Sequence, residues 1–183
     1  MTDKVSDIER IITGCLKNDR LSQRQLYDLY APEMFGVCRR YANSEEEAED
    51  ILMEGFMYVF KNLGSYSHKG SFKAWVRAVM LNSAISHFRN SRRFRLEVLP
   101  DDTESMEYFE DEKQITTNLL TEQLLELMQR MPKVMGVVFN LKVVDEYSFT
   151  EIAQMLGKNE NAVRNSYMRA RKWLMEELKD EKD

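Results

Sequence analysis

The sequence holds few residues that interrupt helices and no stretch long enough to cross a membrane. Of its 183 residues only 7 are Gly and 3 are Pro. Residues that favour helices, such as Leu, Met, Glu, Lys and Arg, are frequent. This composition predicts an all-α protein. No apolar run approaches the roughly 20 residues that a membrane-spanning helix needs, so we expect no membrane insertion.

Cysteine and histidine are also scarce, which argues against a metal centre or an enzyme active site. Neither Cys15 nor Cys38 has a mate at the spacing of a metal site. Without a secretory segment, they indicate a reduced, cytoplasmic protein. His68 and His87 are isolated in the sequence. We therefore predict no catalytic residues, no metal and no cofactor.

Acidic residues are missing from one long stretch, although the net charge of the chain is −5. Between Glu54 and Glu97 every charged residue is Lys or Arg, and from Glu97 to Glu112 every one is Asp or Glu. The basic stretch can attract a phosphate backbone. The acidic stretch shows no helical or strand period, so we interpret residues 96–117 as a flexible linker. It is either a solvated tether or a segment that occupies a basic channel of a partner.

Hydrophobic periodicity and capping signals predict helices over 4–17, 21–41, 45–62, 71–91, 118–130 and 132–144. We expect a break or restart near Pro32 in the second of these. Ser44 and Glu47 form an S-x-x-E capping box before the third, and Pro132 suits a first helical turn. Two small helical domains, 1–95 and 118–183, would then flank the linker.

Residues 148–174 have the pattern of a helix-turn-helix. Ser148 and Glu151 form a capping box, Gly157 suits the left-handed end of that helix, and Asn159 can cap the next. Four apolar residues recur at helical spacing in the second helix: Val163, Tyr167, Ala170 and Leu174. We place five polar residues on its opposite face: Arg164, Asn165, Arg169, Arg171 and Lys172. Such a helix fits the major groove of DNA. The alternative is a surface hairpin with solvated charges.

Two segments of the first domain carry further signals. In residues 44–63, Glu47, Asp50 and Glu54 form one acidic ridge, for which a basic partner is plausible. In residues 70–95, aromatic and basic side chains alternate: Phe72, Trp75 and Phe88 with Lys73, Arg77, Arg89, Arg92 and Arg93. That mixture is typical of single-strand binding. The alternative is that Phe72, Val76, Val79 and Ile85 are core residues, which we expect of all four.

In this order, the segments resemble a bacterial sigma factor of the sigma-70 family, in the minimal two-domain extracytoplasmic-function group. The segments that carry the resemblance are AEDILMEGFMYVFKNL, GSFKAWVRAVMLNSAISHFRNSRR and the final helix-turn-helix. The resemblance implies a transcription initiation factor. It would bind core RNA polymerase, read the −35 duplex and capture the melted −10 strand. It also implies an anti-sigma factor as a partner and a monomer when free.

The resemblance assigns three sets of site residues. Polymerase contacts would be Glu47, Asp50, Met53 and Glu54. Contacts to the −10 strand would be Lys69, Phe72, Lys73, Trp75, Arg77, Asn82, Ser86, Arg89, Arg92 and Arg93. At the −35 element, Glu160, Asn161, Arg164 and Asn165 would read base edges, and Arg169, Arg171 and Lys172 would hold phosphates.

The chain departs from the family pattern at three positions and leaves a second function open. Met53 stands where Gln is usual, Leu81 where Arg is frequent and Ser86 where Asp is frequent. The alternative function is a stand-alone helix-turn-helix regulator that binds duplex DNA as a dimer. It would explain residues 148–174 but would leave the basic aromatic segment without a role.

Overall fold

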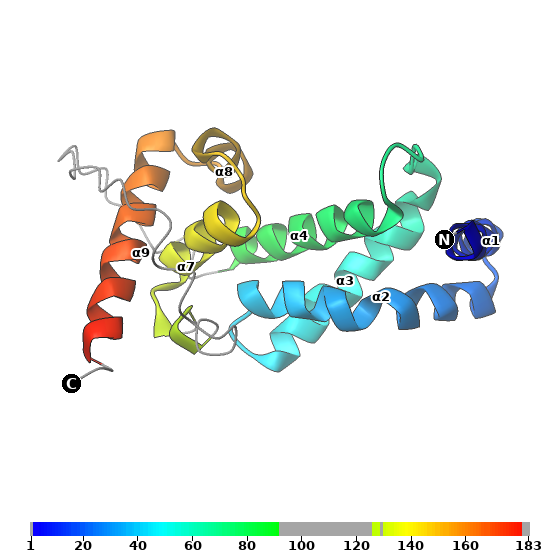
Figure 1. The fold of residues 1–183 in the computed structure, drawn as a ribbon, viewed down its shortest axis with the longest axis horizontal. Coiled ribbons are helices and arrows are strands. Elements are labelled where there is room, and N and C mark those ends of the chain that lie inside the picture. Colours follow the sequence, from blue (N-terminus) through cyan, green and yellow to red (C-terminus); the bar gives the residue numbers. More distant parts are fainter. Residues whose placement is uncertain (1, 92–125, 129, 181–183) are drawn as a thin grey trace. The chain divides into compact units, whose positions relative to one another are not determined.

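The computed structural model describes residues 2–91, 126–128 and 130–180, which contain helices and no strand (Figure 1). The chain divides into two compact units, Met1–Phe88 and Arg89–Asp183. The predicted all-α class is therefore confirmed. The predicted linker lies outside the described residues, and so does most of the helix expected over 118–130.

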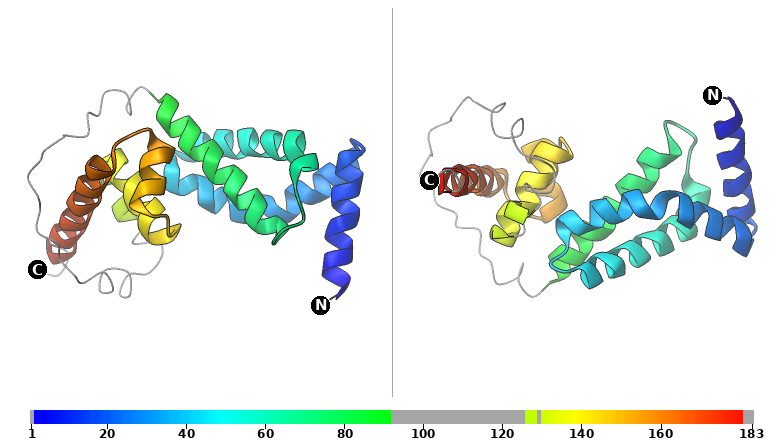
Figure 2. Two further views of the ribbon diagram at one scale, coloured as in Figure 1. Left: turned by 90° about the horizontal axis from the view of Figure 1, so that it is seen from above. Right: turned by 60° about the horizontal axis from the view of Figure 1, so that its bottom comes forward.

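The first unit consists of four α-helices and one short 3-10 turn. They are α1 (Thr2–Leu16), α2 (Arg20–Tyr41), α3 (Glu45–Asn62), η1 (Leu63–Ser65) and α4 (Phe72–Asn90). Helix α2 packs along α3, and the first residues of α2 contact α1 (Figure 2). Asp19 begins α2 by accepting a hydrogen bond from the Ser22 amide at 2.9 Å. Ser44 begins α3 in the same way with the Glu47 amide, at 3.1 Å.

The break expected at Pro32 is absent, since α2 runs unbroken through that residue. Proline in a helix interior costs about 3 kcal/mol. Leu26 and Ala31 before it, and Met34 and Val37 after it, are all buried in the core of the first unit. Because residues on both sides of the proline are held by the same core, packing outweighs the local preference to end the helix.

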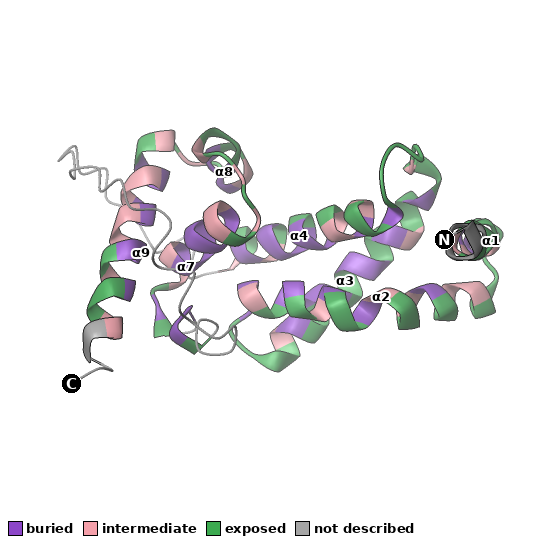
Figure 3. Cartoon of the chain, in the orientation of Figure 1, coloured by how far each residue is buried: buried purple, intermediate pink, exposed green. Residues whose placement is uncertain are grey.

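Close approaches between helices define the core of the first unit. A Cβ placed on Gly55 of α3 would lie 2.2 Å from the sulfur of Met80 in α4. A Cβ on Gly14 of α1 would lie 2.0 Å from the hydroxyl oxygen of Ser22 in α2. Purple bands along α2, α3 and α4 mark the buried faces that meet there (Figure 3). A larger residue at either glycine would therefore force the facing side chain to move.

Both cysteines lie in this core as free thiols. Burial raises the pKa of Cys38 to about 12 and raises the pKa of Cys15 as well. The two side chains are packing residues with little thiolate character. None of the described helices is long and apolar enough to span a membrane.

The second unit contains α7 (Lys133–Phe139), η2 (Asn140–Val144), α8 (Phe149–Leu156) and α9 (Glu160–Asp180). The helix expected over 132–144 is α-helical only as far as Phe139. It then widens into a π-turn, in which the Asp145 amide donates to the Asn140 carbonyl at 3.0 Å. Pro132 precedes the first helical residue. The core of this unit includes nearly all of α7 and one face each of α8 and α9; its buried residues include Phe139, Leu141, Ile152, Leu156 and Leu174.

Candidate nucleic-acid and partner interfaces

The turn between α8 and α9 has the predicted helix-turn-helix geometry. The Ser148 hydroxyl accepts from the Glu151 amide at 3.2 Å, and the Glu151 carboxylate accepts from the Ser148 amide at 2.8 Å. Gly157 ends α8 in the left-handed conformation, with φ of 63°. Asn159 caps α9 by accepting from the Ala162 amide at 2.6 Å. All three signals read from the sequence are confirmed.

Helix α9 presents one polar stripe away from its buried face. Asn161, Asn165 and Lys172 follow at spacings of four and seven, so they share a side of the helix. Asn161 and Lys172 are exposed, and Asn165 is half-buried. The buried residues Val163, Tyr167, Ala170 and Leu174 occupy the other side. This stripe is the part of α9 that a DNA groove could meet.

Glu160 and Arg164 lie at the edge of that stripe and bind each other. The Arg164 Nε donates to Glu160 Oε1 at 2.9 Å, and the Thr150 hydroxyl donates to Glu160 Oε2 at 2.7 Å. These hydrogen bonds, first that from Thr150 and then that from Arg164, lower the pKa of Glu160. The sequence interpretation did not identify Phe149 and Thr150 of α8 as neighbours of α9, because only the fold brings them next to that helix.

The expected exposure of Arg171 is wrong. Arg171 is 6% exposed, and its guanidinium carbon lies 6.0 Å from the ring centroid of Tyr167. Arg171 follows Tyr167 by four residues, so helical geometry places both on the same face. The burial of Arg171 therefore argues against its predicted contact with a phosphate. Arg169 is half-buried.

Helix α4 carries a second stripe, formed by Trp75, Asn82, Ser86 and Arg89. Their spacings of seven, four and three place them on one side of the helix. Trp75 is half-buried and the other three are exposed. The structure thus brings together four of the residues predicted for the −10 strand. Leu81, a departure from the family pattern, is 1% exposed and belongs to the core.

Phe72 is a core residue, so its predicted contact with a nucleic-acid strand is corrected. It is 6% exposed and packs against the rings of Tyr30, Tyr66 and Trp75, with centroids 5.0–5.6 Å away. The sequence interpretation missed Tyr66, which lies in the loop between α3 and α4. Its hydroxyl donates to the Gly70 carbonyl at 2.8 Å. Tyr66 therefore holds this loop against Trp75.

Three of the remaining basic residues of the predicted strand site, Lys69, Lys73 and Arg77, do not lie on the α4 stripe. Lys73 forms an ion pair with Glu33 of α2, at 2.8 Å. Lys69 is exposed in the loop, and Arg77 is half-buried. Arg92 and Arg93 lie outside the described residues. Of the residues expected to be core, Val76 and Ile85 are buried and Val79 is only half-buried.

The acidic ridge on α3 faces a histidine that the sequence interpretation had left isolated. The Nε2 atom of His87 in α4 lies 3.3 Å from Glu47 Oε1, and its Nδ1 atom lies 3.8 Å from Glu54 Oε2. The other oxygen of Glu47 accepts from the Asn43 amide. Asp50 and Glu54 are exposed. Two of the three ridge carboxylates thus help to join α3 to α4.

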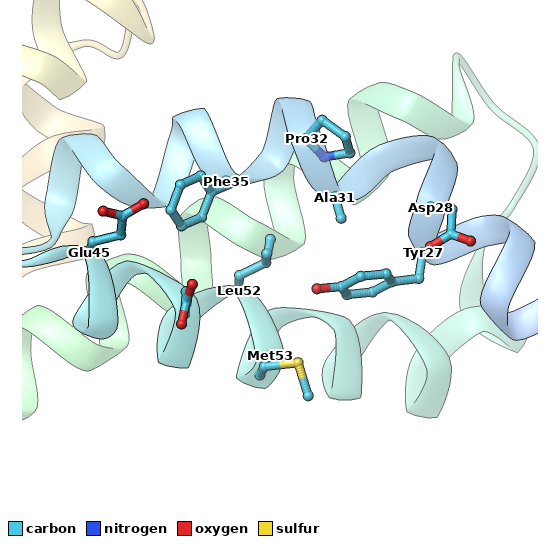
Figure 4. Close-up of a pocket in the computed structure, with 9 residues that line it drawn as sticks. Tyr27, Asp28, Ala31, Pro32, Phe35, Glu45, Leu52 and Met53 are labelled. Carbon is cyan, nitrogen blue, oxygen red and sulfur yellow. The ribbon is translucent and has the colours of Figure 1, made fainter.

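Next to this ridge, residues of α2 and α3 line an open groove of about 470 Å³ (Figure 4). Its apolar lining includes Tyr27 and Phe35 of α2 and Leu52 and Met53 of α3. Asp28, Glu45 and Glu49 add carboxylates to its rim. Met53 is 55% exposed and Met57, one turn further along α3, is 69% exposed. Flexible methionines on an exposed helix are well suited to a protein partner.

Comparison with known proteins gives a consistent match over both units. The sigma-70 region 2 family matches residues 26–94, and the sigma-70 region 4 family matches residues 121–174. The chain is 28% identical to the extracytoplasmic-function sigma factor BldN of Streptomyces coelicolor, over 86% of this chain and 60% of that protein. It is 24% identical to the sigma factor SigW of Bacillus subtilis, over 94% of this chain and 97% of SigW.

A solved structure supports the fold. The sigma factor RpoE of Bartonella quintana, crystallised with the anti-sigma factor NepR, matches with a TM-score of 0.51 and 20% identity. The match covers 85% of this chain and 96% of that one. Region 2 followed by region 4 defines a transcription initiation factor. The chain belongs to the sigma-70 family, in its extracytoplasmic-function group. It is a promoter-directing sigma factor and not an enzyme, and the stand-alone regulator is not favoured.

Proposed function

We propose that α3 is the polymerase-binding helix and that its contact is centred on Met53, Asp50 and Glu54. The exposure of Met53 and Met57 supports this assignment, as does the pair of exposed carboxylates beside them. Glu47 has a different role in this proposal, because its carboxylate is already engaged by Asn43 and His87. It holds the start of α3 in place.

The −10 strand is bound by the α4 stripe. Trp75 supplies an aromatic face on which an unpaired base can stack, and Asn82 and Ser86 supply hydrogen-bonding groups on the same side of the helix. Arg89 attracts the backbone at the far end of the stripe. The observation that carries this proposal is the alignment of a partly exposed tryptophan with these polar side chains. Extrusion of a base costs a few kcal/mol, which stacking offsets.

The −35 duplex is read by α9. Asn161, Asn165 and Arg164 contact base edges, while Arg169 and Lys172 contact phosphates. Arg171 is left out of this set because of its burial. The partners in this proposal are core RNA polymerase, promoter DNA as duplex and single strand, and an anti-sigma factor. The protein acts in the cytoplasm and is a monomer when free.

The test uses labelled protein, bacterial core polymerase and promoter DNA. We expect tight binding to polymerase by fluorescence anisotropy, and specific DNA binding only in the joint complex. Trp75→Ala should then reduce promoter opening, followed by 2-aminopurine fluorescence at the −10 element, far more than it reduces duplex binding. The expected loss is roughly 5- to 100-fold, which is the value of one base–aromatic stack.

Trp75→Phe is the matched control, since it keeps an aromatic face, and should retain most of the opening. Thermal unfolding of each variant separates a loss of stacking from a loss of packing against Tyr66 and Phe72. An equal loss of opening and duplex binding in Trp75→Ala would contradict the stacking role. Specific duplex binding without polymerase would overturn the sigma-factor mechanism itself.

A further inference from the structure

Glu160 and Phe149 contact Arg164 directly, and Thr150 contacts Glu160. Glu160 lies one turn earlier in α9, whereas Phe149 and Thr150 begin α8. The Arg164 Nε donates to Glu160 Oε1 at 2.9 Å, and Nη2 donates to the same oxygen. The guanidinium is therefore joined to the carboxylate along one edge.

The second oxygen of Glu160 is joined to α8. It accepts the Thr150 hydroxyl proton at 2.7 Å. Three of the roughly four lone-pair sites of a carboxylate are thus used inside the protein. Glu160 therefore has little capacity left for its predicted contact with a base edge, where a glutamate would accept from the amino group of a cytosine. The carboxylate links Thr150 to Arg164.

Phe149 also contacts the guanidinium of Arg164. The Arg164 carbon Cζ lies 4.5 Å from the Phe149 ring centroid. The ring is itself held edge-to-face against Tyr167, with centroids 5.4 Å apart, and Lys142 Nζ lies 5.0 Å from its centroid. Because a bidentate contact with guanine requires a guanidinium in the plane of the base, the contacts with Glu160 and Phe149 bear on sequence recognition.

We propose that Thr150, Glu160 and Phe149 are positioning residues for Arg164. They hold its guanidinium in the orientation that reads one base pair of the −35 element, and Glu160 makes no contact with DNA. This inference rests on the proposed reading of the duplex by α9. Its consequence is that the preference at that base pair depends on a hydroxyl group in α8. The effect of Thr150 passes entirely through Arg164.

The experiment uses the complete protein with core polymerase and a promoter library randomised over the −35 element. Arg164→Ala first identifies the base pair whose preference it abolishes. Thr150→Val, which keeps the branched shape and removes the hydroxyl, should weaken the preference at that same base pair roughly fivefold, as expected for one hydrogen bond. Thr150→Ser keeps the hydroxyl and should retain the preference. The salt dependence of binding should stay unchanged, because no phosphate contact is lost.

A double-mutant cycle tests whether Thr150 acts through Arg164. In the Arg164→Ala background, Thr150→Val should have no further effect on sequence preference. Glu160→Ala should repeat the effect of Thr150→Val at the same base pair, while Glu160→Gln, which retains an acceptor, should be milder. Phe149→Tyr should preserve the preference and Phe149→Leu should weaken it. Thr150 is exposed, so its variants should fold normally, and thermal unfolding checks this.

Three results would overturn the inference. One is a uniform loss of affinity over all sequences in Thr150→Val. Another is additivity of Thr150→Val and Arg164→Ala. The third is a changed preference at a base pair other than the one assigned to Arg164. If the unmodified holoenzyme showed no preference anywhere in the −35 element, the proposed function of α9 would fail as well.

Discussion

At the scale of single residues, the most informative contacts are those in which one side chain serves two elements. Glu47 accepts from Asn43 at the start of α3 and approaches His87 of α4. Glu160 joins the starts of α8 and α9 in the same manner. Sequence patterns identified both glutamates by their position near a helix start. The family resemblance assigned each one an external partner, and the internal contacts were missed because contacts made across the fold leave no local signal.

A residue-scale prediction concerns the capping box of α8. Hydrogen bonds from the Ser148 hydroxyl and amide lower the pKa of Glu151. A lowered pKa stabilises the folded state above the ordinary glutamate value of about 4.3, and that stabilisation is lost as the pH falls through the folded-state value. Because Ser148 is the N-cap of α8, Ser148→Ala should reduce the free energy of unfolding by about 1 kcal/mol at pH 7. The loss should be smaller at pH 3, where the bond between the Ser148 hydroxyl and the Glu151 carboxylate contributes less. Urea unfolding, followed by tryptophan fluorescence at both pH values, measures the difference.

Ser148→Thr is the control for this prediction, since threonine retains the hydroxyl and is itself a good cap. It should preserve most of the stability and its dependence on pH. A loss in Ser148→Ala that is the same at both pH values would mean that the Glu151 carboxylate contributes nothing to the cap.

At the scale of elements, local signals predicted where most helices begin and end. Ser44, Ser148, Gly157 and Asn159 all occupy the capping positions read from the sequence. Two predictions fail inside helices. Helix α2 continues through Pro32 because its flanks share one core, and the segment after Phe139 becomes a π-turn. Neither outcome can be read from the propensity of the residues involved.

The element-scale prediction compares two glycines inside helices. Gly55→Ala should destabilise the protein by about 1–3 kcal/mol, because the new methyl group would overlap with the buried side chain of Met80. Gly36→Ala is the matched control in α2. A Cβ there would meet nothing within 4 Å, so alanine should stabilise the helix by up to about 1 kcal/mol. Thermal unfolding measures both changes, and equal stabilisation by the two variants would contradict the close approach of α3 and α4.

At the scale of the whole molecule, the sequence predicted the class and the order of the functional segments. The all-α class and the family are confirmed. The sequence predicted less accurately which of the site residues are exposed. Trp75, Asn82, Ser86 and Arg89 do align on α4, whereas Phe72 and Arg171 are buried. Which of several suitable side chains faces outward depends on the packing of helices that lie far apart in the chain.

The molecule has two tryptophans, Trp75 in the first unit and Trp173 in the second. Because each unit has its own core, we expect the two units to unfold separately. In a Trp173→Phe protein, Gly55→Ala should lower the urea midpoint reported by Trp75. In a Trp75→Phe protein, the same substitution should leave the midpoint reported by Trp173 unchanged. A parallel shift of both midpoints would show that the units unfold as one.

The division of the chain at Phe88 also bears on how the protein is made. The last buried residue of the first unit is Phe88 itself, and the helices of this unit are joined by short connections. Proteins rich in such local contacts fold quickly, and domains fold as units during synthesis. Once residue 88 has left the ribosome, the first unit has every residue of its core. It is therefore expected to fold while α9, the helix proposed to read DNA, is still being translated.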